Sequence, residues 1–293
     1  MQLDVMSAKR PEVIIRGLSL LLRQRSHLVG NVRRFVCLAL LLWLPLGAVA
    51  QQTAPARRPQ AKTQQERDDF NRVYAVTGAA AVEVAADDFS NKYPESELRH
   101  YLYSSAMLQY QREENPARML VMGEKVLTLD PDNPLALVLT ATAMADGLAD
   151  YDRDRDRKIG IIKRNAAHAI QVAETGFATS AEPTAGLYKT TLQSMAYSAL
   201  GIMKLKTGDD AGAEKDLRIA SELTKARPDP YVWYHLALAQ DHRKKYTAAL
   251  NSVEQALQLA SSNPELQKLA EAEHERLAGL TKGPRNAGSA EPQ

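Results

Sequence analysis

The chain has 293 residues, of which 45% are hydrophobic, 25% charged and 6% aromatic. These proportions are ordinary for a globular protein, and the shortage of aromatic residues disfavours a sheet built on bulky strand formers. The formal net charge is +2, but residues 1–50 hold seven basic and two acidic groups, so the rest of the chain holds 30 basic and 33 acidic groups. A protein that binds nucleic acid needs a basic surface, so we expect no nucleic-acid partner.

Residues 1–50 have the organisation of an N-terminal extension and a secretory signal peptide. Arg33 and Arg34 precede the apolar run FVCLALLLWLPLG, which is followed by small residues that end at Ala50. A basic region, a short apolar core and an A-x-A site predict export and cleavage after Ala50, which gives a periplasmic or secreted protein. The apolar stretch 35–50 is shorter than the roughly 20 residues that span a bilayer. Its retention as an uncleaved membrane anchor is the alternative.

The segments on either side of the main domain are polar. Residues 51–63, QQTAPARRPQAKT, contain proline and predict a flexible linker, and residues 281–293 predict a disordered tail. Residues 64–280 show helical periodicity broken by turn signals, which predicts one helical domain. The only cysteine, Cys37, precedes the cleavage site, so the exported chain has no disulfide, thiolate nucleophile or cysteine metal ligand.

The first half of this domain contains two junctions between helices. The stretch AADDFSNKYPESEL (85–98) is closed by Pro94, and EKVLTLDPDNPLAL (124–137) has Pro131 at the end of one helix and Pro134 at the start of the next. Proline is accepted in the first turn of a helix and cannot continue one that has ended. One helix pair is therefore expected from about residue 65 and a second between the two junctions.

The charged stretch YDRDRDRK (151–158) lies between PLALVLTATAMADGL and KIGIIKRNAAHAIQVAE, the two expected helices of the next pair. A calcium loop that begins at Asp152 requires glycine at its sixth position and glutamate at its twelfth, where the chain has Arg157 and Lys163. We therefore interpret the stretch as the solvated start of the second helix, with a contact to a partner protein as the alternative. Acidic groups there complement the helix dipole, and helical spacing allows the pairs Asp152–Arg155, Asp154–Arg157 and Asp154–Lys158.

Two segments further along the chain repeat one another at a distance of 36 residues. The first is YSALGIMKLKTGDDAGAEKDLRIA from Tyr197, and the second is WYHLALAQDHRKKYTAALNSVEQA from Trp233. A fixed period of this size is the signature of stacked helix pairs, each of which buries its apolar stripe against its neighbours. The matching positions are Leu200 and Leu236, Ala213 and Ala249, Leu217 and Val253, and Ala220 and Ala256.

This pattern resembles the tetratricopeptide repeat (TPR). Leu200-Gly201 is the Leu-Gly pair of that family as written, and Ala237 replaces the glycine in the second copy. The resemblance is clearest at 194–227 and 230–263. It implies an all-α fold: about five antiparallel helix pairs in a right-handed superhelical array, capped by a final helix over 263–280. A weaker copy places Tyr103, Ala106, Tyr110, Met119, Val126 and Pro131 at the same spacings.

The resemblance implies a scaffold that binds a protein or peptide in a concave groove lined by the first helix of each pair. The signal peptide predicts that it acts in the cell envelope, and no cofactor or metal is expected. The chaperone-binding members hold a carboxylate with a lysine and asparagine clamp, which Ser104, Leu108, Ser198 and Ile202 do not match. Some of the residues expected in the groove would alternatively pack between repeats. The expected groove residues are Tyr101, Ser104, Leu108, Gln111, Val138, Thr142, Met195, Ser198, Ile202, Tyr231, Tyr234, Leu238 and Asp241.

The sequence shows none of the common catalytic patterns, such as G-x-S-x-G, H-E-x-x-H or a phosphate-binding glycine loop. His235 and His242 share a helix face two turns apart, which is too far for one metal ion without a third ligand. An enzyme is therefore not expected. The stretch FSNKYPESEL resembles the repeats of outer-membrane assembly and cell-division coordinator proteins. A subunit of such a complex, anchored by residues 35–50 where these are retained, is the alternative function.

Overall fold

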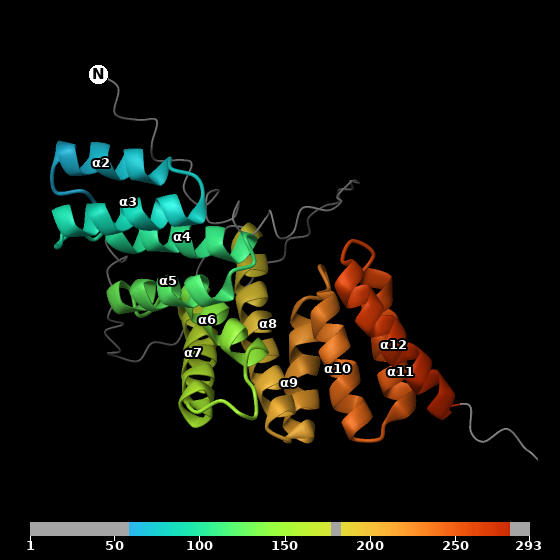
Figure 1. Ribbon diagram of the computed structural model, residues 1–293. Helices are drawn as coiled ribbons and strands as arrows, with labels where there is room; N and C mark the ends of the chain where they lie inside the picture. The colour runs from blue at the N-terminus through green and yellow to red at the C-terminus, as the bar shows by residue number, and fades with distance from the viewer. Residues whose placement is uncertain (1–58, 177–182, 282–293) are drawn as a thin grey trace, which may run out of the picture. The chain divides into compact units, whose positions relative to one another are not determined.

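The computed structural model describes residues 59–176 and 183–281, and in these ranges it contains eleven α-helices and no strand (Figure 1). The expected N-terminal extension, the signal peptide, most of the linker and all but the first residue of the tail lie outside the described residues. The helices are α2 (Gln64–Tyr74), α3 (Ala79–Lys92), α4 (Arg99–Arg112), α5 (Pro116–Leu129), α6 (Pro134–Asp146), α7 (Arg155–Gly176), α8 (Pro183–Lys206), α9 (Asp210–Leu223), α10 (Pro230–His242), α11 (Tyr246–Leu259) and α12 (Pro264–Thr281).

The helices form five consecutive pairs and a final helix. Within each pair the second helix runs back along the first, as α4 and α5 or α10 and α11 show (Figure 1). The most extensive contacts in the described chain are those inside the pairs from α4–α5 to α10–α11, and each pair also contacts the next. This confirms the predicted all-α array of antiparallel helix pairs.

Side-chain caps explain where several helices begin. Asn115, Asn133 and Asp229 each stand directly before a proline that opens a helix, and their side-chain oxygens accept hydrogen bonds from backbone N–H groups of the first turn. Capping of this kind satisfies donors that have no partner inside the helix, and proline has no N–H to satisfy there. Gly208 has a φ of 81°, a left-handed conformation that glycine adopts without strain, in the turn between α8 and α9.

Small residues set the distance between the two helices of a pair. Ala213, Ala220, Ala249 and Ala256 are completely buried, as expected from their repeated positions. Gly201 on α8 faces Leu217 on α9 so closely that an added Cβ would lie 2.5 Å from the Cγ of the leucine. The Leu-Gly pair of the sequence is therefore a point of close helix crossing, where a larger side chain does not fit.

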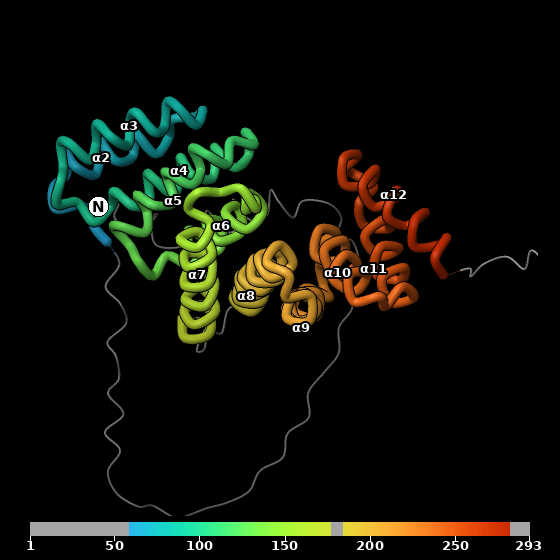
Figure 2. The backbone as a smooth tube through the Cα atoms, turned by 60° about the horizontal axis from the view of Figure 1, so that its bottom comes forward, coloured from blue at the N-terminus to red at the C-terminus, as the bar shows by residue number. Residues whose placement is uncertain are grey.

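The first helices of most successive pairs also contact one another, although α4 and α6 of the described chain have slight or no contact. Helix α8 contacts both α6 and α10, α10 contacts α12, and α2 contacts α4, whereas contacts between successive second helices of the described chain are slight or absent. Figure 2 shows α8 between α6 and α10. Because the first helices mostly approach each other more closely than the second helices do, we call α4, α6, α8 and α10 the inner row. None of the described helices combines the length and apolar character needed to cross a membrane.

Candidate functional site

The structure places most of the predicted groove residues at partly accessible positions of the inner row. Val138, Ser198 and Ile202 are buried, so these three do not offer surface to a partner in this structure. Tyr231 is the most open of the set, with 44% of its surface exposed. The remaining residues are half-buried: Tyr101, Ser104, Leu108, Gln111, Thr142, Met195, Tyr234, Leu238 and Asp241.

Two tyrosines of the predicted groove pack against their own domain. The ring of Tyr101 on α4 lies edge-on to Phe70 on α2, with centroids 6.5 Å apart, and therefore joins two first helices. Tyr234 packs against the buried cluster that includes Ala249 and Leu277, so α11 and α12 cover part of it. Trp233, the first residue of the second repeated segment, touches this cluster and the one around Leu217.

Several accessible side chains near the inner row have shifted pKa values. Asp146 and Asp229 are exposed, yet desolvation by the surrounding protein raises the pKa of both carboxyl groups. Desolvation also lowers the pKa of His235 to about 4, although its hydrogen bond with the Tyr231 carbonyl oxygen opposes this shift, and raises the pKa of Tyr188 to about 12.

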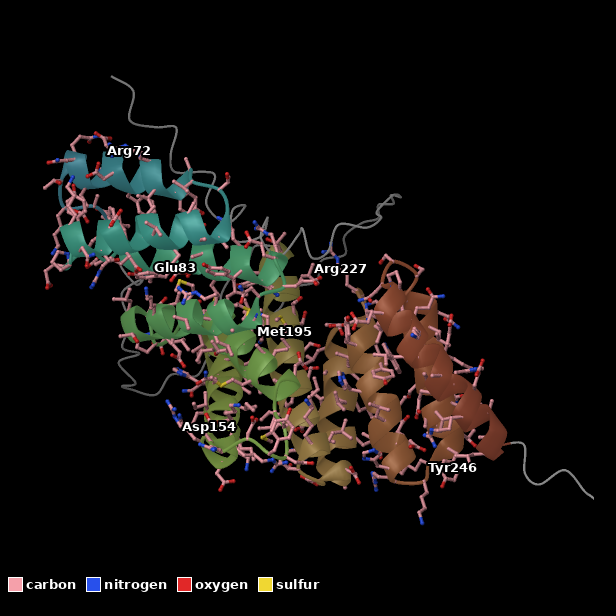
Figure 3. The ribbon with its side chains drawn as sticks, viewed as in Figure 1. Arg72, Glu83, Asp154, Met195, Arg227 and Tyr246 are labelled. Carbon is pink, nitrogen blue, oxygen red and sulfur yellow. The ribbon has the colours of Figure 1, made fainter. Side chains whose placement is uncertain are left out.

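A pocket of about 650 Å³ lies where α5, α6 and α7 meet. Each helix turns one face toward it, because the lining residues recur at helical spacing along α6 and α7. On α7 this face begins in the charged stretch YDRDRDRK, where Asp154 lies at the start of the helix (Figure 3). Sequence reasoning did not find this pocket, because its walls come from three helices. The lining comprises Gln111, Glu114, Asn115, Pro116, Ala117, Met119, Leu120, Glu124, Leu139, Thr142, Ala143, Met144, Asp146, Gly147, Asp154, Arg157, Lys158 and Ile161.

The charges around this pocket are unevenly paired. Lys158 lies 3.0 Å from Asp152 and 3.4 Å from Asp154, so the expected Asp154–Lys158 pair is present. Glu114, Glu124 and Asp146 form no ion pair within the described residues. The carboxylates of Glu114 and Glu124 are therefore available to a cationic group from outside, whereas Asp146 already lies near the ammonium group of Lys206, which donates a hydrogen bond to its backbone carbonyl oxygen.

The charged stretch is held mainly by contacts within the chain. Asp152 accepts a hydrogen bond from the backbone N–H of Ala149, which together with Lys158 lowers the pKa of its carboxyl group. Arg155 lies 3.1 Å from Asp150 and donates a hydrogen bond to the carbonyl oxygen of Lys206 on α8. The pairs Asp152–Arg155 and Asp154–Arg157, which helical spacing also allowed, do not form as ion pairs among the described residues. In the same ranges no group of three or more His, Cys, Asp or Glu side chains is placed to hold a metal ion.

Buried glutamates connect neighbouring pairs. Glu214 on α9 is almost fully buried and pairs with Arg218 of its own helix and with Arg243 and Lys245 in the turn between α10 and α11. Burial opposes its ionisation, yet hydrogen bonds from Lys245 and Arg243 keep the pKa of its carboxyl group below the ordinary value. Glu83 on α3 (Figure 3) is also buried, and it accepts a hydrogen bond from the hydroxyl of Tyr110 on α4 at 2.6 Å.

No protein-family model and no curated protein matches the sequence. Solved structures that resemble it include a thermophilic TPR protein of Thermus thermophilus (15% identity, 71% of this chain and 98% of the other, TM-score 0.44). A second is the MamA RS-1 ArsTM double mutant, with 16% identity, coverage of 62% of this chain and 94% of the other, and a TM-score of 0.35. A third is the APC/C hetero-tetramer Cut9-Hcn1, with 16% identity, coverage of 72% of this chain and 43% of the other, and a TM-score of 0.33. The fold described above rests on the helix pairs and contacts of this chain.

Proposed function

We propose that the chain is a non-enzymatic scaffold that binds a partner protein or peptide along the inner row. The observation that carries this proposal is the arrangement of the first helices: α8 contacts α6 and α10, while successive second helices have little or no mutual contact. An inner row of this kind presents side chains of several helix pairs to one ligand. Arrays of stacked helix pairs bind their ligands on such extended surfaces.

The accessible side chains of the inner row suit a protein ligand. Tyr231 is exposed, and its hydroxyl is held by the side-chain amide of Asn263 at a distance of 2.8 Å. A tyrosine whose ring is presented in a fixed position loses little entropy on binding and is a frequent interface anchor. Leu108, Leu238 and Gln111 add half-buried apolar and polar surface on α4 and α10.

The place of action that we propose is the cell envelope. The basic, apolar and A-x-A segments of residues 1–50 support export and cleavage after Ala50. Retention of residues 35–50 as a membrane anchor, in a subunit of an outer-membrane assembly or cell-division complex, is the second candidate. N-terminal sequencing of the protein isolated from cells separates the two, because cleavage gives Gln51 as the first residue and an anchor leaves residues 35–50 in place.

Site-specific photo-crosslinking tests the inner-row surface. A benzophenone amino acid is placed at Tyr231 on α10 or, as the matched control, at the exposed Asn251 on α11 of the same pair. The proposal predicts a discrete crosslinked partner from position 231 and none from position 251 under the same irradiation. Crosslinking from position 251 alone would place the partner on the outer helices and overturn the proposal.

A further inference from the structure

The pocket between α5, α6 and α7 extends beyond the inner row, because α5 and α7 are second helices, although Gln111 of α4 and Thr142 of α6 also line it. Its volume of about 650 Å³ lies within the range of pockets that enclose a ligand group. The interior is mainly apolar, with Leu120, Met144 and Ile161 half-buried and still partly accessible. An apolar side chain that enters this pocket would bury surface that water now contacts.

The rim of the pocket selects the charge of its ligand. Four of the ionisable residues in the lining are acidic, Glu114, Glu124, Asp146 and Asp154, and two are basic, Arg157 and Lys158. Lys158 is engaged by Asp152 and Asp154, which leaves Arg157 as the cation of the lining that has no ion pair in the described residues. The ionisable side chains of the lining therefore carry a net negative charge, which attracts a cation and repels an anion.

One buried polar atom adds to this description. The hydroxyl oxygen of Thr142, on the α6 face that lines the pocket, has no hydrogen-bond partner although it is shielded from solvent. A buried polar group without a partner is costly, and rotation of this side chain toward the pocket would allow a ligand backbone to bond its hydroxyl. An extended peptide has both the N–H and C=O groups that a hydroxyl can bond.

We propose that this pocket binds a peptide segment of a partner protein in which an apolar side chain stands next to lysine or arginine. The apolar side chain contacts Leu120 and Met144, and the cation pairs with Glu114 or Glu124. This site is distinct from the inner-row surface around Tyr231, so each can be disabled without the other. In this arrangement Asp154 and Lys158 of the charged stretch form one wall of a binding pocket.

Fluorescence anisotropy with designed peptides tests the proposal. The probe is a labelled peptide with two leucines alternating with two lysines in a glycine–serine frame, and its matched controls replace the lysines by glutamates or the leucines by serines. We expect saturable binding of the probe at least about tenfold tighter than that of either control, weakened as salt is added. Equal binding of the glutamate peptide would overturn the charge assignment, and equal binding of the serine peptide would overturn the apolar one.

A pair of charge reversals locates the binding. Glu124→Lys changes the pocket rim, and Asp88→Lys makes the same change on the exposed face of α3, away from the pocket. We expect Glu124→Lys to weaken binding of the probe about five- to tenfold and Asp88→Lys to weaken it less than twofold. Both variants should have melting temperatures near that of the unmodified protein. Equal losses in the two variants would show attraction to overall charge and overturn the pocket. Crosslinking from position 231 is unaffected by Glu124→Lys if the two sites are separate.

Discussion

Gly201 marks a point of tight packing within the α8–α9 pair. The equivalent position of the next pair holds Ala237, and the facing residue changes from Leu217 to Val253. The smaller glycine on the first helix is thus matched by the larger leucine on the second, and the larger alanine by the smaller valine. We predict that Gly201→Ala destabilises the protein by about 1–2 kcal/mol, because overpacking outweighs the usual gain of alanine in a helix. Chemical denaturation measures the difference.

Two further variants make this prediction specific. Gly279 lies on α12 with open space around the position of a Cβ, so Gly279→Ala is expected to stabilise by about 0.5–1 kcal/mol. The double change Gly201→Ala with Leu217→Val recreates the pair found at Ala237 and Val253, and we expect it to be more stable than Gly201→Ala alone. Additive effects of the two changes would contradict the steric coupling.

His235 makes stability depend on pH. Its pKa is lowered to about 4 in the folded chain, whereas a histidine in the unfolded chain titrates near 6.5. Between these values the unfolded state binds more protons than the folded state. The contribution of His235 to the unfolding free energy is therefore fully present above about pH 6.5 and is lost as the pH falls toward 4. We predict that His235→Gln reduces the slope of unfolding free energy against pH in this window. The same slope in both proteins would show that His235 titrates normally.

Substitutions of Tyr231 and Trp233 are expected to affect stability and partner binding differently, although the two residues are close in the sequence. Trp233 touches two buried clusters, so Trp233→Ala is expected to cost about 3–5 kcal/mol of stability. Tyr231 is exposed, so Tyr231→Ala is expected to leave the melting temperature nearly unchanged and to weaken partner binding by about 1–2 kcal/mol. Thermal melting together with binding to the crosslinked partner measures both. Early melting of Tyr231→Ala would contradict the assignment of its side chain to the surface.

At the scale of helices, Glu214 connects α9 to the turn between α10 and α11. We predict that Glu214→Ala lowers stability by about 1–2 kcal/mol, less than the 3–5 kcal/mol typical of breaking a buried pair, because Arg243 and Lys245 are partly exposed and return to water. Glu222→Ala is the control, since its pair with Lys225 lies on the exposed side of the same helix, and its expected effect is below about 0.5 kcal/mol. Equal effects in denaturation experiments would contradict the role of Glu214 as a connector.

The helices were largely predictable because local signals specify them. Pro134 and Pro230 mark the first turn of their helices, and the 36-residue period marks the buried alanines. The surfaces were less predictable because they depend on how neighbouring pairs meet. Helical phase alone assigned Val138 and Ile202 to the groove, whereas contacts with adjacent helices bury both side chains.

The charged stretch shows the same limit within one element. Its role at the start of a helix followed from its composition, and the Asp154–Lys158 pair from helical spacing. Its position beside a pocket did not, because Glu124 and Thr142 reach the same space from α5 and α6. Local periodicity cannot predict which faces of three helices converge.

At the scale of the whole molecule, the described helices form a chain of neighbour contacts from α2 to α12. Stability in such an array is close to a sum over helix pairs and their interfaces, so local changes act mainly on adjacent pairs. A long charged side chain at the fully buried Ala256 is therefore expected to unfold α10–α12 and to leave α2–α7 helical. Hydrogen exchange of Ala256→Arg, resolved by peptide, checks this, and uniform loss of protection would contradict the repeat description.

The central claim is that partners bind along the inner row. Hydrogen exchange of the chain with and without its crosslinked partner tests it most directly, because each helix is read separately. The account predicts slower exchange in α8 and α10, around Met195 and Tyr231, and little change in α9 and α11. Protection confined to α9 and α11 would contradict it.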